Sequence, residues 1–208
     1  VGGHIDSWDV GQGAQDDGGG CVISMEALRL MKRLGLRPRR TIRCVLWTNE
    51  ENGGRGGEVY SREDSLLGTE THVAAVETDG GVERPVGFRF TVRRAAGDSA
   101  DLERSARIVE RAKAIGPLLA GLGANRIETG GGGADITPLM KRGVLGVEHV
   151  TSMEHYFDWH HTPADMLDKV DPVELRKNVA ALAVMVYVLA DMPEPFTTLE
   201  PAAVLRAA

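Results

Sequence analysis

Side chains that can bind a metal ion or move a proton follow four segments of this chain. They are His4, the pair Glu50 and Glu51, Asp79, and the pair His160 and His161. Three of the preceding segments, residues 41–48, 72–78 and 143–150, are rich in β-branched and apolar residues, which predicts buried strands. The Gly-Gly step before His4 is typical of the end of another strand. Because ligands collect at the carboxyl ends of parallel strands, the pattern predicts one polar site at that edge of a sheet.

Histidine, aspartate and glutamate without cysteine are the donors of a hard or borderline divalent metal site, most often zinc. Two ions about 3.5–4 Å apart need a bridging carboxylate, further ligands and a base for a shared water, and the chain offers that number of groups. Each group alone has a plainer interpretation as a solvated loop residue, a turn or a helix cap. The sequence contains no G-x-S-x-G elbow, no H-E-x-x-H pair and no Walker loop, so other hydrolytic and nucleotide chemistries are disfavoured.

Apolar periodicity predicts helices between the strands. We expect helices at residues 21–34, 98–115 and 135–142. One further strand is expected at residues 86–92. Asp135 is expected to cap the third helix. A last helix begins at an Asp171 cap, with Pro172 at its first position and Glu174 placed for a capping box. Strands alternating with helices predict an α/β fold with a mostly parallel sheet and helices on both faces.

The composition is that of one ordinary globular domain, with 208 residues, 42% hydrophobic and 26% charged. The net charge of -6 disfavours a nucleic-acid partner. No apolar run approaches the roughly 20 residues that a membrane helix needs, so we expect no membrane span. Cys21 and Cys44 lack the spacing of a thiolate metal site, and we expect them to pack as small apolar residues without a disulfide.

Four stretches, in this order, resemble the co-catalytic di-zinc exopeptidases. They are GGHIDSWDVGQGAQDDGGG at residues 2–20, LGLRPRRTIRCVLWTNEENGG at 34–54, ETDGG at 77–81 and HHTPAD at 160–165. The likeness is greater to plasma glutamate carboxypeptidase-like members than to bacterial leucyl aminopeptidase-like members. It implies a three-layer α/β/α catalytic domain with a mostly parallel mixed sheet over residues 1–192, followed by a C-terminal tail at 193–208.

Carried over position by position, the resemblance implies a site for two Zn²⁺ ions per chain. His4 and Asp79 would hold one ion. Glu51 and His161 would hold the other, and Asp16 would bridge both. His161 is favoured over its neighbour because the family pattern places a Thr directly after the ligand and an Asp three positions further on.

The resemblance also implies roles around these ligands. Asp6 would accept the second N–H of His4 and fix its tautomer. Glu50 would be the general base. Members of the family often have a cis peptide after the bridging carboxylate, here between Asp16 and Asp17, and the glycines that follow would let a helix start close to the metal ions.

The activity implied is hydrolysis of a terminal peptide bond of a peptide or dipeptide, with a metal-bridging water as nucleophile and Glu50 as its base. Two alternatives stay open: a related acyl-cyclising or deacylating metalloenzyme, and a metal-free binding domain on the same fold. Glycines 130–133 either bind a substrate terminus or form a turn. Tyr156, Phe157 and Trp159 either line a specificity pocket or pack structurally.

The chain begins at Val1, and the first strands of the family fold are not in it. We therefore expect a fragment with an exposed sheet edge, which either pairs two chains into a homo-oligomer or needs an upstream segment. The resemblance implies a secreted or periplasmic protein, since relatives typically have that location.

Overall fold

The structure, a computed structural model, describes residues 1–62, 71–93 and 99–198. Strands of the described residues form one sheet in the order β2-β1-β3-β6-β4-β5. Their bounds are β1 (Gly2–His4), β2 (Val45–Trp47), β3 (Ala74–Glu77), β4 (Pro85–Thr91), β5 (Arg126–Thr129) and β6 (Leu145–Thr151). Every neighbouring pair is parallel except β4 with β6, which is antiparallel. The predicted α/β class with a mostly parallel mixed sheet is confirmed.

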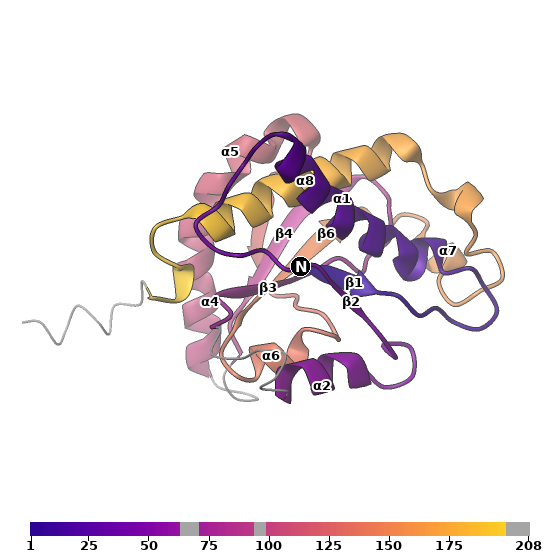
Figure 1. Ribbon diagram of the computed structural model, residues 1–208, viewed down its shortest axis with the longest axis horizontal. Helices are drawn as coiled ribbons and strands as arrows, with labels where there is room; N and C mark the ends of the chain where they lie inside the picture. The colour runs from indigo at the N-terminus through magenta and orange to yellow at the C-terminus, as the bar shows by residue number, and fades with distance from the viewer. Residues whose placement is uncertain (63–70, 94–98, 199–208) are drawn as a thin grey trace, which may run out of the picture.

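Helices cover both faces of the sheet. They are α1 (Gly19–Arg33), α2 (Arg55–Arg62), α4 (Ser99–Ala112), α5 (Gly116–Leu119), α6 (Thr137–Met140), α7 (Tyr156–Trp159) and α8 (Pro172–Asp191). Figure 1 shows α1 and α8 packed together on one side of the sheet, with α2 and α6 on the other. The structure therefore has the three α/β/α layers that the resemblance implies.

The two faces of the sheet have separate hydrophobic cores. Val76 and Val147 point into the larger core, which Ile23 of α1 and Leu182 of α8 also enter. Ala75, next to Val76 on β3, points the other way into a smaller core. The smaller core also contains Trp47, Ile136, Leu139 and Met140. Since successive strand residues face opposite sides, β3 anchors both helical layers.

The predicted cap of α8 is confirmed, but two other expectations about caps are wrong. The Asp171 carboxylate accepts a hydrogen bond from the peptide N–H of Val173 at 2.6 Å. Glu174 forms no capping box, because its carboxylate pairs with Lys177 at 2.7 Å. Asp135 does not cap α6: its side chain is fully buried and neither carboxylate oxygen has a hydrogen-bond partner in the described part of the chain.

The sequence reasoning missed strand β5 and helix α2. Helix α2 contains Gly56 and Gly57, which lower helix propensity and made residues 53–57 look like a loop. The structure explains Gly57 by close packing, because a Cβ at this position would lie 2.2 Å from the carbonyl oxygen of Asp135. Strand β5 begins at the polar pair Arg126 and Glu128, whose side chains form an ion pair at 2.6 Å, so it lacks an apolar run.

The C-terminal end of the described chain folds back on the larger core. Phe196 is 6% exposed and its ring meets that of Phe90 edge to face, with centroids 6.2 Å apart. The predicted division between a domain at 1–192 and a tail at 193–208 stays a prediction, and residues 199–208 lie outside the described residues. Both described cysteines, Cys21 and Cys44, are free, as expected.

His149 on β6 makes the stability of the fold depend on pH. Burial lowers the pKa of His149 from 6.5 to about 4, because its imidazole lies inside the protein against the ring of Phe88. Below pH 6.5 the unfolded chain therefore binds a proton that the native chain does not, so native stability falls until the pH reaches about 4. We expect this histidine alone to cost about 2 kcal/mol between pH 7.5 and pH 5.

Urea unfolding at the two pH values measures that loss. His149→Phe keeps an aromatic ring against Phe88 and removes the titrating group. The loss between pH 7.5 and pH 5 should then be smaller in the variant by about 2 kcal/mol. An equal loss in the two proteins would contradict the assignment.

Candidate metal centre

The chemistry-bearing side chains lie where the parallel strands end. His4 is the last residue of β1, and Asp79 lies two residues after the end of β3. The loop after β2 carries the Glu50–Glu51 pair, with Asn49 at a φ of 64° just before it. Asp16 lies in the short segment η1 (Ala14–Gly18) between β1 and α1, at a kink where the backbone angles of Asp16 and Asp17 are not helical. The loop after α7 carries His160 and His161.

A first cluster surrounds the imidazole of His4, which is 1% exposed. Its Nε2 lies 3.0 Å from Oδ1 of Asp16 and 3.5 Å from Oδ1 of Asp79. Burial lowers the pKa of His4, but the contacts of its ring with the carboxylates of Asp16 and Asp79 outweigh this effect and raise the pKa to about 12. The carboxylates therefore strongly stabilise a positive charge at this position.

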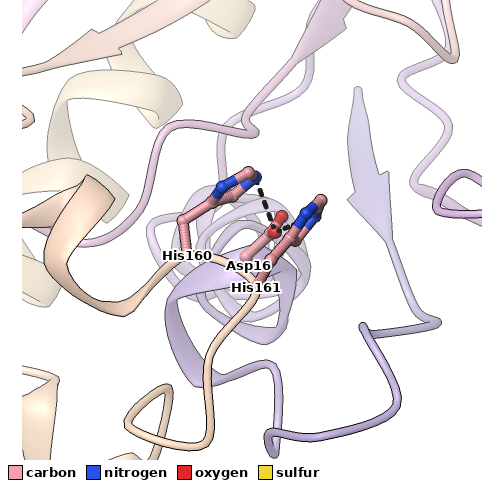
Figure 2. A group of neighbouring side chains, drawn as sticks. All are labelled: Asp16, His160 and His161. Atoms are coloured by element: carbon pink, nitrogen blue, oxygen red, sulfur yellow. Dashed lines mark ion pairs between the residues drawn. The ribbon is translucent and has the colours of Figure 1, made fainter.

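A second cluster lies on the other oxygen of Asp16. Nε2 of His160 and Nε2 of His161 each lie 3.2 Å from Oδ2 of Asp16, as the dashed lines in Figure 2 show. Of these two histidines, His161 alone also pairs with Glu51, at 2.8 Å between Nε2 and Oε2. The structure thus brings His161 to both expected neighbours and places His160 beside Asp16 only.

Asp16 connects the two clusters, since one carboxylate oxygen faces each. The groups that could hold a metal ion among the described residues are His4 with Asp16 and Asp79, and Asp16 with His160 and His161. Burial would raise the pKa of Asp16, but the hydrogen bond and charge of His4 and the two later imidazoles lower it. This carboxylate is therefore held in its ionised form.

The backbone around Asp16 is fixed by two other aspartates. Oδ1 and Oδ2 of Asp165 accept the peptide N–H groups of Gln15 at 2.7 Å and of Asp16 at 3.1 Å. Asp17 is fully buried, and its carboxylate accepts the peptide N–H groups of His4 and Gly20, both at 3.0 Å. The peptide between Asp16 and Asp17 is cis, as the resemblance implied.

Helix α1 starts against the site because Gly20 has no side chain. A Cβ at Gly20 would lie 1.9 Å from the carbonyl oxygen of Thr78 and 2.3 Å from Oδ1 of Asp17. The close approach brings the end of β3 next to the turn that carries Asp16. Glycine in the opening stretch thus allows the backbone of α1 to lie against β3 and the turn of Asp16, where a side chain would not fit.

The expected contact between Asp6 and His4 is corrected by the structure. Nδ1 of His4 lies 2.9 Å from the backbone carbonyl oxygen of Asp6. The carboxylate oxygen Oδ1 of Asp6 is farther from the same nitrogen, at 3.9 Å. The chain turns directly after β1, which places the carbonyl nearer to the ring. The Asp6 carboxylate instead accepts the peptide N–H of Glu50 at 3.2 Å and so fixes the backbone of that residue.

Three carboxylates of the site, those of Glu50, Glu51 and Asp79, have raised pKa values. Burial is the main cause for Glu50, Glu51 and Asp79, and neighbouring carboxylates add to it, whereas His4 opposes the shift. Oδ1 of Asp79, Oε1 of Glu51 and Oδ2 of Asp16 are buried and make no hydrogen bond within the described residues. Buried acceptors without donors are uncommon in native proteins, where ordered water or a bound cation satisfies them.

Two aromatic residues lie against the histidines of the site, and one of them, Trp8, was given no role from the sequence. The indole of Trp8 stacks on the imidazole of His161, with ring centroids 4.4 Å apart and planes 13° apart. Tyr156 is 4% exposed, and its ring lies 5.0 Å from that of His160. Of the residues considered for a specificity pocket, Tyr156 is therefore buried beside the site, whereas Phe157 is 71% exposed.

Comparison with known proteins identifies the family. Residues 1–186 match the model of "Peptidase family M28". The chain belongs to peptidase family M28. Over 194 residues this M28 chain is 40% identical to carboxypeptidase Q of Homo sapiens and 41% identical to that of Mus musculus, which covers 93% of the chain in each case. It spans 38% of the length of these curated relatives.

Solved structures agree with the assignment. A peptidase M28 precursor from Shewanella amazonensis superposes with a TM-score of 0.74 at 33% identity, covering 93% of this chain and 41% of that one. A glutaminyl cyclase from Porphyromonas gingivalis has a TM-score of 0.56 at 18% identity, over 90% of this chain and 70% of that one, so it shares the fold. None of the described helices of the M28 chain is long and apolar enough to cross a membrane.

Proposed function

We propose that this chain carries the catalytic site of a two-zinc exopeptidase, which hydrolyses a terminal peptide bond of peptides or dipeptides. The observation that carries the proposal is the position of Asp16, with Oδ1 on His4 and Oδ2 on His161. One carboxylate between two ligand clusters is the arrangement that a two-metal site requires. The likeness to carboxypeptidase Q favours a carboxypeptidase within this class.

The donor set fits two zinc ions. His4, Asp16 and Asp79 would hold one ion, and Asp16, Glu51 and His161 the other. Nitrogen and oxygen donors without thiolate suit zinc in a catalytic site, where each ion keeps a position open. The buried oxygens of Asp79, Glu51 and Asp16 that make no hydrogen bond would gain a cation as their partner. Two zinc ions would polarise the scissile carbonyl and supply hydroxide near neutral pH.

Glu50 is the proposed general base and later the general acid. It takes a proton from the attacking water and returns it to the leaving amine. Burial raises the pKa of Glu50, which moves the carboxylate toward the range where it can both accept and donate a proton near neutral pH. Asp6 holds the peptide N–H of Glu50 at 3.2 Å and so fixes where its side chain starts. Asp6 is thus a positioning residue in this scheme.

The expected result for the purified chain is two equivalents of zinc, measured by elemental analysis after equilibration and gel filtration. Binding to the native state alone should raise stability by about 2.7 kcal/mol for an ion at 100 times its dissociation constant. Thermal unfolding with and without a chelator measures that gain. A chain that binds no zinc and unfolds at the same temperature in both conditions would argue for a metal-free binding domain.

A substrate panel separates the enzyme classes. Dipeptides with a free or blocked amino end and a free or blocked carboxyl end report which terminus the site requires. N-terminal glutamine peptides and acylated amines test the cyclising and deacylating alternatives. Release of amino acids from dipeptides is the expected result, and turnover of the glutamine or acyl substrates alone would contradict the proposal.

Two further predictions from the sequence concern the pairing of chains and the location of the protein. Strand β2 is one edge of the sheet, so pairing of two chains through such an edge stays a prediction. A secreted or periplasmic location likewise stays a prediction from the resemblance.

A further inference from the structure

Three aromatic rings form a continuous stack beside the proposed metal site. The indole of Trp8 lies on the imidazole of His161, with centroids 4.4 Å and planes 13° apart. On its other face His161 stacks on His160, with centroids 3.6 Å and planes 20° apart. The ring of His161 is thus held between two flat neighbours, one of which comes from the opposite end of the chain.

Trp8 contacts the His161 member of the pair formed by Glu51 and His161, whose Oε2 and Nε2 atoms are 2.8 Å apart. Its indole covers the imidazole of His161. Trp8 therefore orients the nitrogen donor of this pair with its side chain.

The loop that carries Trp8 is joined to the loop that carries His161. The peptide N–H of Gln12 donates to the carbonyl of Asp165 at 2.9 Å, and the side-chain oxygen of Gln12 accepts the peptide N–H of Leu167 at 3.4 Å. The backbones approach so closely at Gly11 that a Cβ there would lie 2.8 Å from the carbonyl oxygen of Thr162. The stack is therefore built into the contact between two loops.

The two imidazoles of the site are oriented in different ways. Nδ1 of His4 is held by the carbonyl oxygen of Asp6 at 2.9 Å. Within the described residues, Nδ1 of His161 makes no such hydrogen bond, although histidines that bind metals nearly always have a partner on the second nitrogen. The backbone of His161 is also left-handed, with a φ of 59°. Stacking is the remaining contact that defines the plane of this ring.

We propose that Trp8 is the positioning residue for His161. Its ring face orients the imidazole of His161, as the hydrogen bond to the Asp6 carbonyl orients the imidazole of His4. The inference rests on the proposed two-zinc site, because it assigns Trp8 to the half of that site formed by Glu51 and His161. It also predicts that a flat ring is needed at position 8 and that apolar bulk alone does not suffice.

Proton NMR of the chain in chelator tests the stack without any metal. The imidazole protons of His161, assigned by their loss in His161→Gln, should show an upfield ring-current shift. The part of this shift that the indole causes should disappear in Trp8→Leu, where the stack on His160 remains, and be largely kept in Trp8→Phe. The same resonance position in wild type and Trp8→Leu would overturn the inference, whether or not the chain binds zinc.

Zinc titration tests the consequence for the site. Trp8→Leu should weaken one of two zinc equivalents by about 10–100-fold, the usual effect of losing a residue that orients a ligand, and leave the other equivalent unchanged. Trp8→Phe should bind both within about 3-fold of wild type, far less than the ~10–100-fold expected when an orienting residue is lost. Val10→Ala, at another exposed apolar residue of the same loop, is the matched control and should behave as wild type.

The outcomes separate this inference from the proposed function. Wild-type chain that binds no zinc would refute the two-zinc site, and the NMR comparison would still decide the role of Trp8. Two equivalents bound by Trp8→Leu with wild-type affinity would refute the role of Trp8 and leave the two-zinc site standing. Equal rescue by Leu and Phe would show that bulk, not stacking, is what position 8 supplies.

Discussion

Glu50→Gln should lose turnover by roughly 10²–10⁴-fold, the usual contribution of a positioned general acid–base group, and still bind two equivalents of zinc. Gln keeps the size and the hydrogen-bonding capacity of the side chain but cannot accept the proton of the attacking water. The zinc content should not change, because the contacts described among the proposed ligands do not involve the Glu50 carboxylate. Steady-state kinetics on a dipeptide and elemental analysis of the same sample measure both quantities.

Two further variants make the result specific. Glu51→Gln, one position along, should lose one zinc equivalent as well as turnover, because Glu51 pairs with His161 at 2.8 Å. Glu58→Gln, at an exposed residue of helix α2 beyond the same loop, should leave both quantities at the wild-type level. If Glu50→Gln keeps most of its turnover, the base is another residue.

The pH profile gives a second test of Glu50. Burial and the neighbouring carboxylates raise the pKa of this side chain, so its ionised form is lost at a higher pH than for an ordinary glutamate. For a general base, kcat/KM should fall as the pH drops through that raised pKa. In Glu50→Gln the residual activity should lack this acidic limb.

Local sequence patterns were enough to predict the sheet and the position of the site at its edge. Apolar runs of strand length end just before Glu50 and Asp79, and the Gly-Gly step before His4 is typical of a strand end. Parallel strands bring such ends together whatever the loops between them do. The buried strand β6 and the capped helix α8 were equally clear, since alternation of burial and a cap with Pro172 are local signals. Local periodicity therefore gave the framework on which the site is built.

The contacts that refine the site could not be predicted in this way. The stack of Trp8 on His161 joins residues far apart in the sequence, and no local pattern marks it. Asp6 contacts the His4 ring through its backbone carbonyl, and its carboxylate accepts the peptide N–H of Glu50. Both contacts depend on the turn of the chain after β1. Asp135 looked like a helix cap by its position, but the approach of α2 encloses it. Tertiary packing overrode the local signal in each case.

Asp16→Asn should remove both zinc ions, which is the largest effect on metal binding that we expect from one substitution. Oδ1 of Asp16 serves the His4 cluster and Oδ2 serves the His161 cluster, so the change removes a charged ligand from both. Each affinity should fall by more than about 100-fold, since even the loss of a residue that only orients a ligand costs ~10–100-fold. Zinc titration with a competing chelator measures this.

The number of ions lost is the decisive readout for Asp16. Asp79→Asn and Glu51→Gln each touch one cluster and should each lose one equivalent. Asp9→Asn, at an exposed residue of the same loop, should lose none. Circular dichroism of metal-free Asp16→Asn should match wild type, because the backbone of the turn is held by Asp165 and Asp17. If Asp16→Asn loses one equivalent only, Asp16 belongs to one cluster, and the two-metal arrangement proposed for this site is wrong.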